Sequence, residues 1–295
     1  MASLTESPTD GPSDRVSPLK PRLATTYEGR DPVLLDTVVP LIDYIEIVPD
    51  AIAKSVDGIR TLSEDTLSQL QMLPTHVSVI AHGVGLSIGS YEGYSQDYLR
   101  LLDLLVDSVN VVWHSEHLGY VTVDGLNLGT MLPLPRTEEA LELVSERIKM
   151  IQRRYGLPFL LENVAHVLPT FGDAYSPAAF LNALVERTGC YLLLDIYNLE
   201  CDVHNHGLDL DEFLDELNLD AVWEIHLANG VEHRGLRLDV HSQLTQQSTL
   251  DIARHVVRST PYVRAVTYEL LSQAVPELGY NAIANELLRI RDQVL

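Results

Sequence analysis

FLLENVAHVLPTFGDAYSPAAFLNALVERTGCYLLLDIYN, residues 159–198, is the stretch of this chain that decides its fold. A short apolar run, Phe159–Leu161, stops at the acidic residue Glu162. A helix-like segment, Pro177–Arg187, then leads into a second apolar run, Tyr191–Leu194. Short apolar runs bounded by polar residues are typical of buried strands, and a helix between two such strands predicts that they pair in parallel.

The same pattern of apolar run, polar stop and helical segment recurs along the chain. Eight such runs within 295 residues match the strand count of a (β/α)8 barrel, so we predict an α/β fold of the TIM-barrel type. The predicted strands are Tyr44–Val48, Val77–Ala81, Val111–Trp113, Phe159–Leu161, Tyr191–Leu194, Val222–Ile225, Leu236–Val240 and Val263–Tyr268. The predicted helices include Tyr98–Val109, Glu138–Tyr155, Pro177–Arg187 and Leu210–Leu217.

One segment interrupts this rhythm after the third predicted strand. Gly119–Leu128 (GYVTVDGLNL) has two alternating runs around Asp124 and Gly125, a dipeptide that favours a tight hairpin turn. We therefore expect a small hairpin insertion there. Residues 1–22 are rich in Ser, Thr, Pro and Asp and predict a disordered tail, which leaves residues 23–295 as a single TIM-barrel domain.

The chain carries 20 Lys and Arg against 42 Asp and Glu, a formal net charge of −22. This excess disfavours nucleic acid and anionic membranes as partners, because both are bound through clustered basic side chains. The N-terminal residues lack the apolar core of a secretory signal, and no apolar run is long enough for a membrane span. We expect a cytoplasmic protein whose two cysteines, Cys190 and Cys201, are reduced thiols.

Polar, chemically active side chains follow most of the apolar runs. Because the C-terminal ends of TIM-barrel strands converge on one site, these side chains are expected to share one rim. From the second strand to the eighth they are His82; His114, Glu116 and His117; Glu162 and Asn163; Asp195 and Asn198; His226; Asp239 and His241; and Glu269.

So many carboxylates in one barrel mouth would repel one another unless cations held them together. Lys and Arg are missing from these strand ends, which removes an internally salt-bridged core as the explanation. The set of imidazoles, carboxylates and an amide is too large for one tetrahedral zinc ion. It fits two or three metal ions with a bridging carboxylate, and we predict a multinuclear metal site.

Ordered motifs along the chain carry a resemblance to a known family. They are HGVGLSIGS (82–90), SEHLGY (115–120), LLENVA (160–165), LLLDIYN (192–198) followed by NHG (205–207), EIHLANG (224–230) and DVHS (239–242). With these motifs the chain resembles the multinuclear non-heme iron-dependent oxidative enzymes (MNIO), which include the iron enzyme of methanobactin biosynthesis. The resemblance implies a TIM barrel with two or three irons that uses O2 to modify a residue, most often cysteine, of a ribosomally made precursor peptide. It also implies a separate partner protein that recognises the peptide.

Residue by residue, the resemblance implies three iron positions, with Glu162 bridging the first two. The implied ligands are His82, His117 and Glu162 for the first iron, Glu162, Asp195, His226 and Glu269 for the second, and Asn198, Asp239 and His241 for the third. The expected catalytic residues among them are Glu162, Asp195 and His226.

Two other enzyme classes remain open on the sequence. The ligand order also resembles the zinc-dependent apurinic endonucleases, metal-dependent hydrolases in which the motif of the fifth strand ends in His, whereas this chain has Asn198. An amide is less suited to zinc, and a basic stripe for a phosphodiester has few candidates beyond Arg234 and Arg237. A xylose isomerase-like barrel with two divalent metals would usually place a Lys among the strand-end acids, and none is present.

The sequence leaves the roles of three residues close to the expected ligands open. Glu46 fits either the barrel rim or a buried structural position. His114 precedes the matching SEH triplet and is interpreted as a supporting or packing residue, with a direct role left open. We expect Glu116 to orient His117 through a carboxylate–imidazole hydrogen bond.

The segment after the fifth predicted strand holds two further histidines and a cysteine. His204 and His206 flank Asn205 and are expected in a loop over the mouth, either solvated or in contact with the substrate. Cys201 is expected to be buried, because an exposed thiol beside redox-active iron would be oxidised. Cys190 is expected to be a small core residue.

Overall fold

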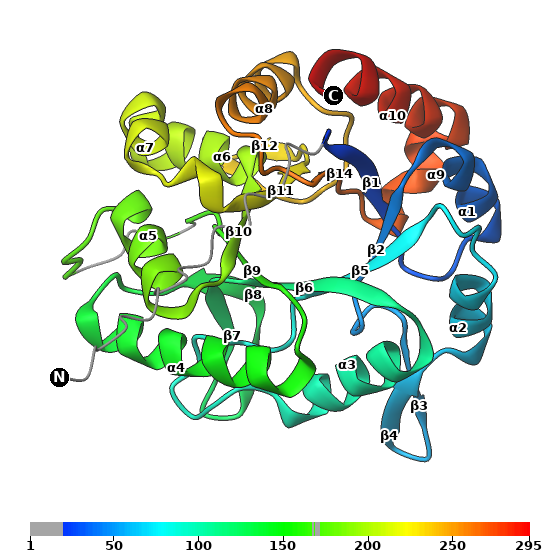
Figure 1. Ribbon diagram of the computed structural model, residues 1–295, viewed down its shortest axis with the longest axis horizontal. Coiled ribbons are helices and arrows are strands. Elements are labelled where there is room, and N and C mark those ends of the chain that lie inside the picture. The colour runs from blue at the N-terminus through cyan, green and yellow to red at the C-terminus, as the bar shows by residue number, and fades with distance from the viewer. Residues whose placement is uncertain (1–19, 167, 169–171) are drawn as a thin grey trace, which may run out of the picture.

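The computed structural model describes residues 20–166, 168 and 172–295. Eight strands close into a barrel in the order β1-β14-β11-β10-β9-β6-β5-β2, and all neighbours are parallel. The barrel strands are β1 (Arg22–Thr26), β2 (Tyr44–Ile47), β5 (Ser78–Gly83), β6 (Val111–His117), β9 (Phe159–Glu162), β10 (Tyr191–Asp195), β11 (Val222–Leu227) and β14 (Ala265–Tyr268). Figure 1 looks along this barrel. The predicted TIM barrel is confirmed.

Helices surround the barrel on the outside (Figure 1). They are α1 (Pro32–Val38), α2 (Glu64–Gln71), α3 (Gln96–Ser108), α4 (Glu138–Tyr155), α5 (Pro177–Thr188), α6 (Ile196–His206), α7 (Leu210–Glu216), α8 (Gln247–Ser259), α9 (Val275–Leu278) and α10 (Tyr280–Val294). The four predicted helices correspond to α3, α4, α5 and α7. Helix α5 shows why they form where the sequence indicates, since Ser176 caps its first turn and Gly189 ends it in the left-handed conformation. None of the helices among the described residues is long and apolar enough to cross a bilayer.

Two strand predictions are wrong. The sequence did not indicate β1, a barrel strand that pairs with β14 and β2. Leu236–Val240 stays outside the barrel, and its first part forms β13 (Leu236–Leu238), which pairs antiparallel with β12 (Val231–His233). The short RLATT segment gives little hydrophobic signal beside a polar tail, whereas LRL has the alternation of a half-exposed hairpin strand. Of the predicted tail, residues 1–19 lie outside the described part, and Arg22 already belongs to β1.

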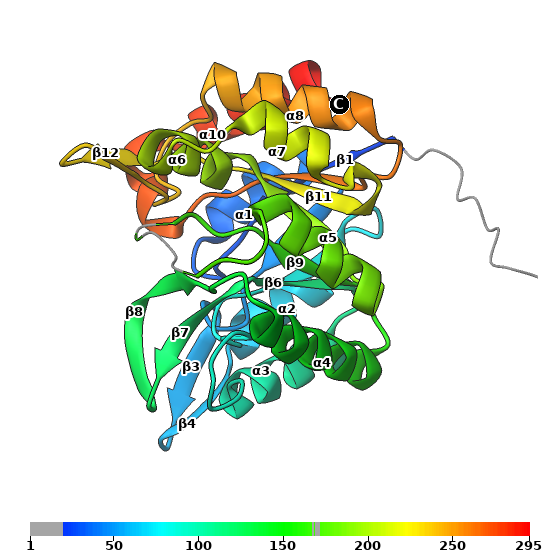
Figure 2. The same ribbon diagram turned by 90° about the vertical axis from the view of Figure 1, so that its left-hand side faces the viewer.

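Three antiparallel hairpins extend from the barrel framework (Figure 2). They are β3 (Ala53–Val56) with β4 (Ile59–Leu62), β7 (Gly119–Val123) with β8 (Leu126–Pro133), and β12 with β13. The two residues of each turn have positive φ, namely Asp57 and Gly58, Asp124 and Gly125, and Arg234 and Gly235. This conformation is that of a type I′ turn, whose twist matches paired strands. The predicted hairpin after the third run is confirmed as β7–β8, whereas the other two hairpins were not predicted.

A mostly apolar layer, which also includes the buried Glu224, lies inside the barrel. Its apolar residues, each at most 3% exposed, are Ala24, Ile80, Trp113, Leu160, Leu193 and Ala265. Because inward-facing residues of a strand lie two positions apart, the next inward positions are His82 on β5, Glu162 on β9 and Asp195 on β10. The fold therefore places a layer of polar side chains directly above an apolar floor, at the C-terminal end of the barrel.

Candidate metal centre

A cluster of imidazoles and carboxylates occupies this upper layer. Nε2 of His82 lies 3.3 Å from Oε2 of Glu162, and Nε2 of His117 lies 3.4 Å from the same oxygen. Nδ1 of His226 lies 2.9 Å from Oε2 of Glu269. These side chains are buried, apart from His117, which is 14% exposed and reaches the opening of the barrel.

Glu162 belongs to two groups of possible metal ligands at once. The groups whose ligand atoms lie within 4.8 Å of one another include His82, His117 and Glu162, and also Glu162, Asp195, His226 and Glu269. A carboxylate shared in this way can bridge two cations. The two groups are the same residue sets that the sequence resemblance implies for the first and second ions.

Hydrogen bonds fix the orientation of two histidines in the cluster. Nδ1 of His82 lies 2.8 Å from Oγ of Ser115, whose hydroxyl can donate to the carbonyl oxygen of Ala81 at 3.4 Å. Nδ1 of His117 donates to the carbonyl oxygen of Gly83 at 2.8 Å. With the proton of each ring on Nδ1, Nε2 carries a lone pair that faces Glu162. This is how proteins hold a metal-binding imidazole in one tautomer.

Several polar atoms of the cluster are buried and make no hydrogen bond to another described residue. These atoms are Oε1 of Glu46, Nε2 of His82, Oε2 of Glu162, Oδ2 of Asp195, Oδ1 of Asn198 and Oδ1 of Asp239. An unpaired buried polar group costs about 1–3 kcal/mol, so such atoms are rare and are normally satisfied by something. Bound cations would coordinate several of these atoms at once and so replace the missing hydrogen bonds. The residues present therefore fit a multinuclear metal centre.

The electrostatics of the cluster also favour a bound cation. Burial and the negative charge of Glu269 raise the pKa of Glu162 well above the usual range of a carboxyl group. Burial likewise raises the pKa of Asp195, and the charge of Asp239 adds to the effect. Burial disfavours the imidazolium of His226, but the surrounding carboxylates outweigh it and raise the pKa of this histidine well above its usual value. A cation that binds here must displace these protons, so metal binding is coupled to deprotonation of the ligand side chains.

The third implied group lies at the edge of the cluster. Asn198 is in the first turn of α6, and its Nδ2 lies 3.4 Å from Oε1 of Glu162. His241 lies 2.7 Å from Oδ2 of Asp239 through Nε2 and 3.3 Å from Oε1 of Glu269 through Nδ1. The loop after β13 delivers Asp239 and His241, and His241 has a φ of 45°, an uncommon conformation that is often kept at functional sites. Asn198 therefore reaches the cluster at Glu162, and Asp239 and His241 reach it at Glu269, although no barrel strand carries these last two.

A cavity of about 840 Å³ opens onto the cluster. Its walls come from the segments after β2 and β5 and from strands β4 and β8. The cluster residues that line it are His117, Asp239, His241 and Glu269. This volume is within the range of pockets that bind small molecules.

The cluster and its cavity lie within a region that matches a family of known proteins. Residues 30–293 match the sequence profile of the family described as "RiPP precursor modification enzyme MbnB/TglH/ChrH". The chain belongs to this family. The predicted MNIO resemblance is confirmed, and the matched residues of this MbnB/TglH/ChrH member include every predicted ligand from His82 to Glu269.

Individual relatives of this MbnB/TglH/ChrH member agree with the assignment. A UPF0276 protein of Caulobacter vibrioides is 41% identical over 129 residues, which are 44% of this chain and 46% of that protein. A UPF0276 protein of Paraburkholderia phytofirmans is 32% identical over 186 residues, 61% of each protein. The chain thus matches about half the length of the Caulobacter relative.

Two solved structures share the fold of the chain. A xylose isomerase domain containing protein from Salmonella typhimurium has a TM-score of 0.61 at 14% identity, with 92% of this chain and 97% of that chain covered. Endonuclease IV from Thermus thermophilus has a TM-score of 0.58 at 18% identity, with 92% and 98% covered. At these identities the likeness shows the fold alone.

Glu116 and His114 of this MbnB/TglH/ChrH member face away from the metal centre, so the predicted role of Glu116 is wrong. Side chains alternate along β6, and those of Ser115 and His117 face inward while those of His114 and Glu116 face α3. Nε2 of His114 lies 3.3 Å from Oε1 of Glu116 and 3.1 Å from the hydroxyl oxygen of Tyr98 on α3. The backbone carbonyl of the neighbouring strand, and not Glu116, orients His117.

His204 and His206 lie in the last turn of α6, so the predicted loop is wrong. The helix continues because it ends only at Gly207, which has the left-handed conformation. Nε2 of His204 lies 3.3 Å from the carbonyl oxygen of Gly235 at a hairpin turn, and Nε2 of His206 lies 2.5 Å from that of His166. Both histidines therefore attach neighbouring segments to the helix. Cys201 and Cys190 are buried as predicted, and burial raises the pKa of both thiols.

Two residues of the centre were not singled out as such from the sequence. Glu46 is fully buried, and its Oε2 lies 3.1 Å from Nε2 of His226. Ser115 contacts His82 from the adjacent strand. The signal for Ser115 was its alternation with His117 on one strand, whereas Glu46 ends no obvious motif and its contact joins residues 180 positions apart.

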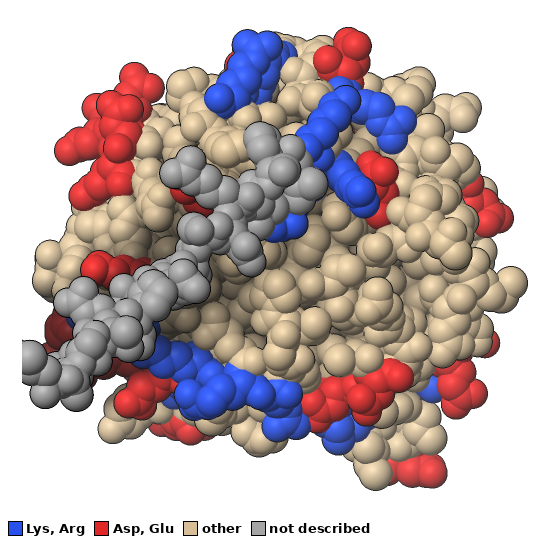
Figure 3. All heavy atoms as spheres, viewed as in Figure 1, with Lys and Arg blue, Asp and Glu red and all other residues tan. Residues whose placement is uncertain are grey.

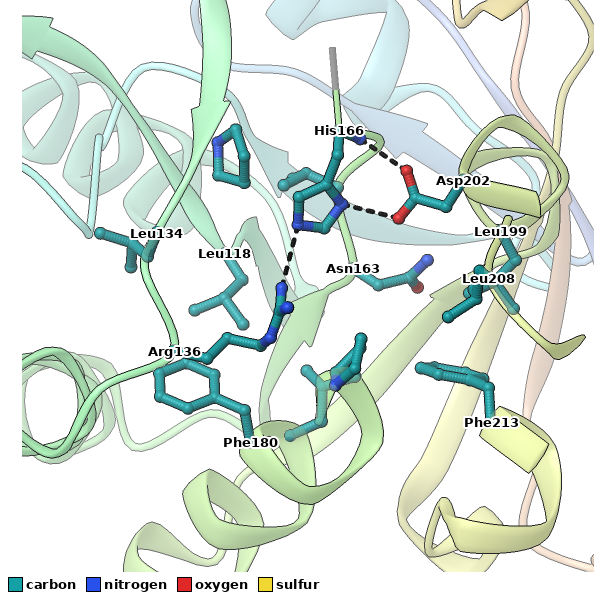
Figure 4. Close-up of a pocket in the computed structure, with 14 residues that line it drawn as sticks. Leu118, Leu134, Arg136, Asn163, His166, Phe180, Leu199, Asp202, Leu208 and Phe213 are labelled. Carbon is teal, nitrogen blue, oxygen red and sulfur yellow. Dashed lines mark hydrogen bonds and ion pairs between the residues drawn. The ribbon is translucent and has the colours of Figure 1, made fainter. Parts of the chain in front are cut away.

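A second cavity lies beside the centre between the β9 segment and α6 (Figure 4). Nδ1 of His166 lies 2.6 Å from Oδ2 of Asp202, and Nε2 of His166 lies 3.3 Å from Nη1 of Arg136. The cavity has a volume of only about 50 Å³ and apolar walls, so it holds a few water molecules at most. Asn163 at its edge exchanges hydrogen bonds with the backbone of Asp195. The cavity of about 50 Å³ is too small for a substrate, although several of its residues also line a neighbouring cavity of about 390 Å³.

Proposed function

We propose that this chain is an O2-dependent multinuclear iron oxidase that modifies a cysteine of a ribosomally synthesised precursor peptide. The observation that carries the proposal is the set of unpaired buried ligand atoms at the end of a cavity of about 840 Å³. Membership of a family of precursor-modifying enzymes supports a peptide as substrate. The donor set supports iron over zinc, because it is rich in carboxylates and includes the amide of Asn198.

In the proposed centre Glu162 would be shared by two irons, and the residues that would hold a third lie nearer the opening. The ligands are His82, His117 and Glu162 for the first iron, Glu162, Asp195, His226 and Glu269 for the second, and Asn198, Asp239 and His241 for the third. Bound iron would supply one-electron chemistry with O2 and would lower the pKa of a substrate thiol that coordinates it.

The residues of the chain bring the reactants together and keep water out. His117, Asp239, His241 and Glu269 line the cavity, so the proposed ions are approached from that side. The apolar layer around Trp113 and Leu193 closes the other side of the cluster. A peptide thiol and O2 that share this cavity react as if within one molecule, which removes much of the entropic barrier of their encounter.

Anaerobic reconstitution with ferrous iron should load about two to three irons per chain, since one bridging carboxylate and nine ligands serve that many ions. Elemental analysis after gel filtration measures the content, and an oxygen electrode measures O2 uptake when precursor peptide is added. Tightly held zinc alone, together with no O2 uptake in the presence of peptide, would contradict the proposal and favour a metal-dependent hydrolase or isomerase.

The cavity has few basic groups that could bind a phosphodiester substrate. A metal-dependent hydrolase is therefore the second candidate function and not the first. Arg60 is the basic residue among the cavity-lining residues that the structure describes. It is already paired with Asp50 at 3.0 Å and with Asp97 at 2.8 Å. A polyanion would therefore meet acidic groups around the opening unless bound cations outweighed them.

We further propose a cytoplasmic enzyme that acts with a separate peptide-recognition protein, as the family resemblance implies. On the face seen in Figure 3, acidic and basic groups alternate around the periphery, while the whole chain carries a charge of −22. Binding of a basic peptide or partner should therefore weaken as salt is raised from about 50 to 300 mM, because screening shortens the range of the attraction. Isothermal titration of the precursor peptide at several salt concentrations measures this, and an affinity independent of salt would contradict it.

A further inference from the structure

Glu46 is a buried acid that the proposed metal ligands do not include, although it forms with His82 and His226 a further group of possible ligand atoms within 4.8 Å of one another. It lies on β2 inside the barrel with no exposed surface, and the inward-facing positions around it carry no Lys or Arg in the described residues. Its Oε2 lies 3.1 Å from Nε2 of His226, while its Oε1 has no hydrogen-bond partner among the described residues. Burying a carboxyl group this way is costly. A contribution to folding therefore does not account for the presence of Glu46.

A second buried acid in the same region provides a contrast. Glu224 lies one inward position below His226 on β11. Its Oε1 accepts a hydrogen bond from Oγ1 of Thr267 at 2.6 Å, and its Oε2 accepts one from Nε1 of Trp113 at 2.7 Å. Both oxygens are satisfied, as expected of a structural residue. Oε1 of Glu224 also lies 3.7 Å from Nε2 of His226, whereas Glu46 contacts that nitrogen at 3.1 Å and leaves its other oxygen unpaired among the described residues.

The two ring nitrogens of His226 face different environments. Nδ1 lies 2.9 Å from Oε2 of Glu269, a residue that lines the cavity and belongs to the ligand group with Glu162 and Asp195. Nε2 faces Oε2 of Glu46 at 3.1 Å and Oε1 of Glu224 at 3.7 Å, and neither residue lines that cavity. For an ion in the group with Glu162, Asp195 and Glu269, Nδ1 is therefore the nitrogen that would bind, and Nε2 is the one that would keep a proton.

We propose that Glu46 is a positioning residue for the metal centre. Its carboxylate accepts the Nε2 proton of His226 and so leaves the lone pair of Nδ1 for the ion shared with Asp195 and Glu269. His82 and His117 are oriented in the same way, but by a hydroxyl and a backbone carbonyl. A carboxylate is the stronger acceptor and makes the imidazole a better ligand. This inference rests on the proposed metal centre and adds to it a residue that fixes one ligand.

The test compares Glu46→Leu and Glu46→Gln with the wild-type full-length chain, each titrated anaerobically with ferrous iron against a competing chelator. Glu46→Leu should weaken the binding of one ion by about 10-fold to 100-fold, the usual effect of removing such a supporting group, and leave the others unchanged. Glu46→Gln keeps an oxygen that can accept the proton and should weaken the same ion by less than about tenfold. Bound iron is measured by elemental analysis.

Thermal unfolding separates this role from a structural one. The metal-free Glu46→Leu chain should melt lower than the metal-free wild type, because Nε2 of His226 loses the carboxylate that it faces. The rise in melting temperature on adding iron should be smaller than in the wild type, because that rise follows the affinity. Glu116→Gln is the matched control, since Glu116 is equally buried on β6 but faces α3, and it should bind iron like the wild type.

The outcomes separate failure of the inference from failure of the proposed function. A wild-type chain that binds no iron would overturn both. A wild type that loads iron while Glu46→Leu loads it equally tightly would overturn the inference alone, as would a metal-free Glu46→Leu chain that melts lower with its iron affinity unchanged. Complete loss of one ion in Glu46→Gln would also overturn it, because that result would make Glu46 a direct ligand.

Discussion

Replacing Glu162 with alanine should reduce the metal content by more than one ion per chain and lower activity by about 10³-fold or more. The reason is that Glu162 belongs to two of the three groups of possible ligand atoms within 4.8 Å, so its loss would affect two ions at once. In the proposed assignment, each of the other ligands holds a single ion. Elemental analysis of the reconstituted variant, together with O2 uptake in the presence of precursor peptide, measures both effects.

The matched control for this variant is Glu200→Gln. Glu200 is 7% exposed on α6 and bonds to Ser248 and Thr249 on α8, away from the ligand groups. This control should keep the metal content of the wild type. A Glu162→Ala chain with full metal content would refute the bridging role, and circular dichroism of both variants shows whether the barrel remains folded.

Replacing Gly83 with alanine should destabilise the protein by about 3 kcal/mol, at the upper end of the cost of overpacking a core. A Cβ atom at this position would lie 1.6 Å from Oε1 and 2.1 Å from Cδ of Glu116, and 2.4 Å from the hydroxyl oxygen of Tyr98. Both side chains are buried, so neither can swing into solvent. Moving β5 instead would shift the carbonyl oxygen that orients His117. Chemical denaturation measures the loss, and iron content should fall with it.

A double variant tests whether the contact with Glu116 is the cause. Glu116→Ala alone leaves a cavity between β6 and α3 and should also be destabilising. In the Gly83→Ala, Glu116→Ala chain the new methyl group occupies part of that cavity. The double variant should therefore be more stable than the sum of the two single effects predicts. Strict additivity, or a Gly83→Ala chain as stable as the wild type, would contradict this explanation.

The barrel could be predicted because most of its strands are short apolar runs that end at a polar residue. The alternation that buries Leu160 and Leu193 in the floor also directs Glu162 and Asp195 upward, so one pattern predicts both fold and site. This reasoning failed for β1, whose RLATT sequence is short and half polar. It assigned Leu236–Val240 to the barrel because hairpin and barrel strands have the same period of two.

The contacts among the residues of the candidate metal centre were harder to predict from the sequence than the residues themselves. The position of Glu116 beside His117 in the sequence suggested a contact, but neighbouring residues of a strand face opposite ways, and Glu116 meets Tyr98 from a helix. Glu46 was left undecided because its partner is distant in sequence and only closure of the barrel brings them together. Asp239 and His241 line the cavity beside the cluster, but a loop and not the predicted barrel strand carries them there.

The layer of side chains inside the barrel determines the side from which the ligand cluster can be reached. Ala24, Ile80, Trp113 and their neighbours seal one end, so whatever reaches the ligand cluster enters through the mouth and departs the same way. A peptide bound in that mouth would block the entry of a small molecule such as O2. The shape of the barrel would then fix the order in which the two reactants bind. Steady-state kinetics with both reactants varied would show an ordered mechanism.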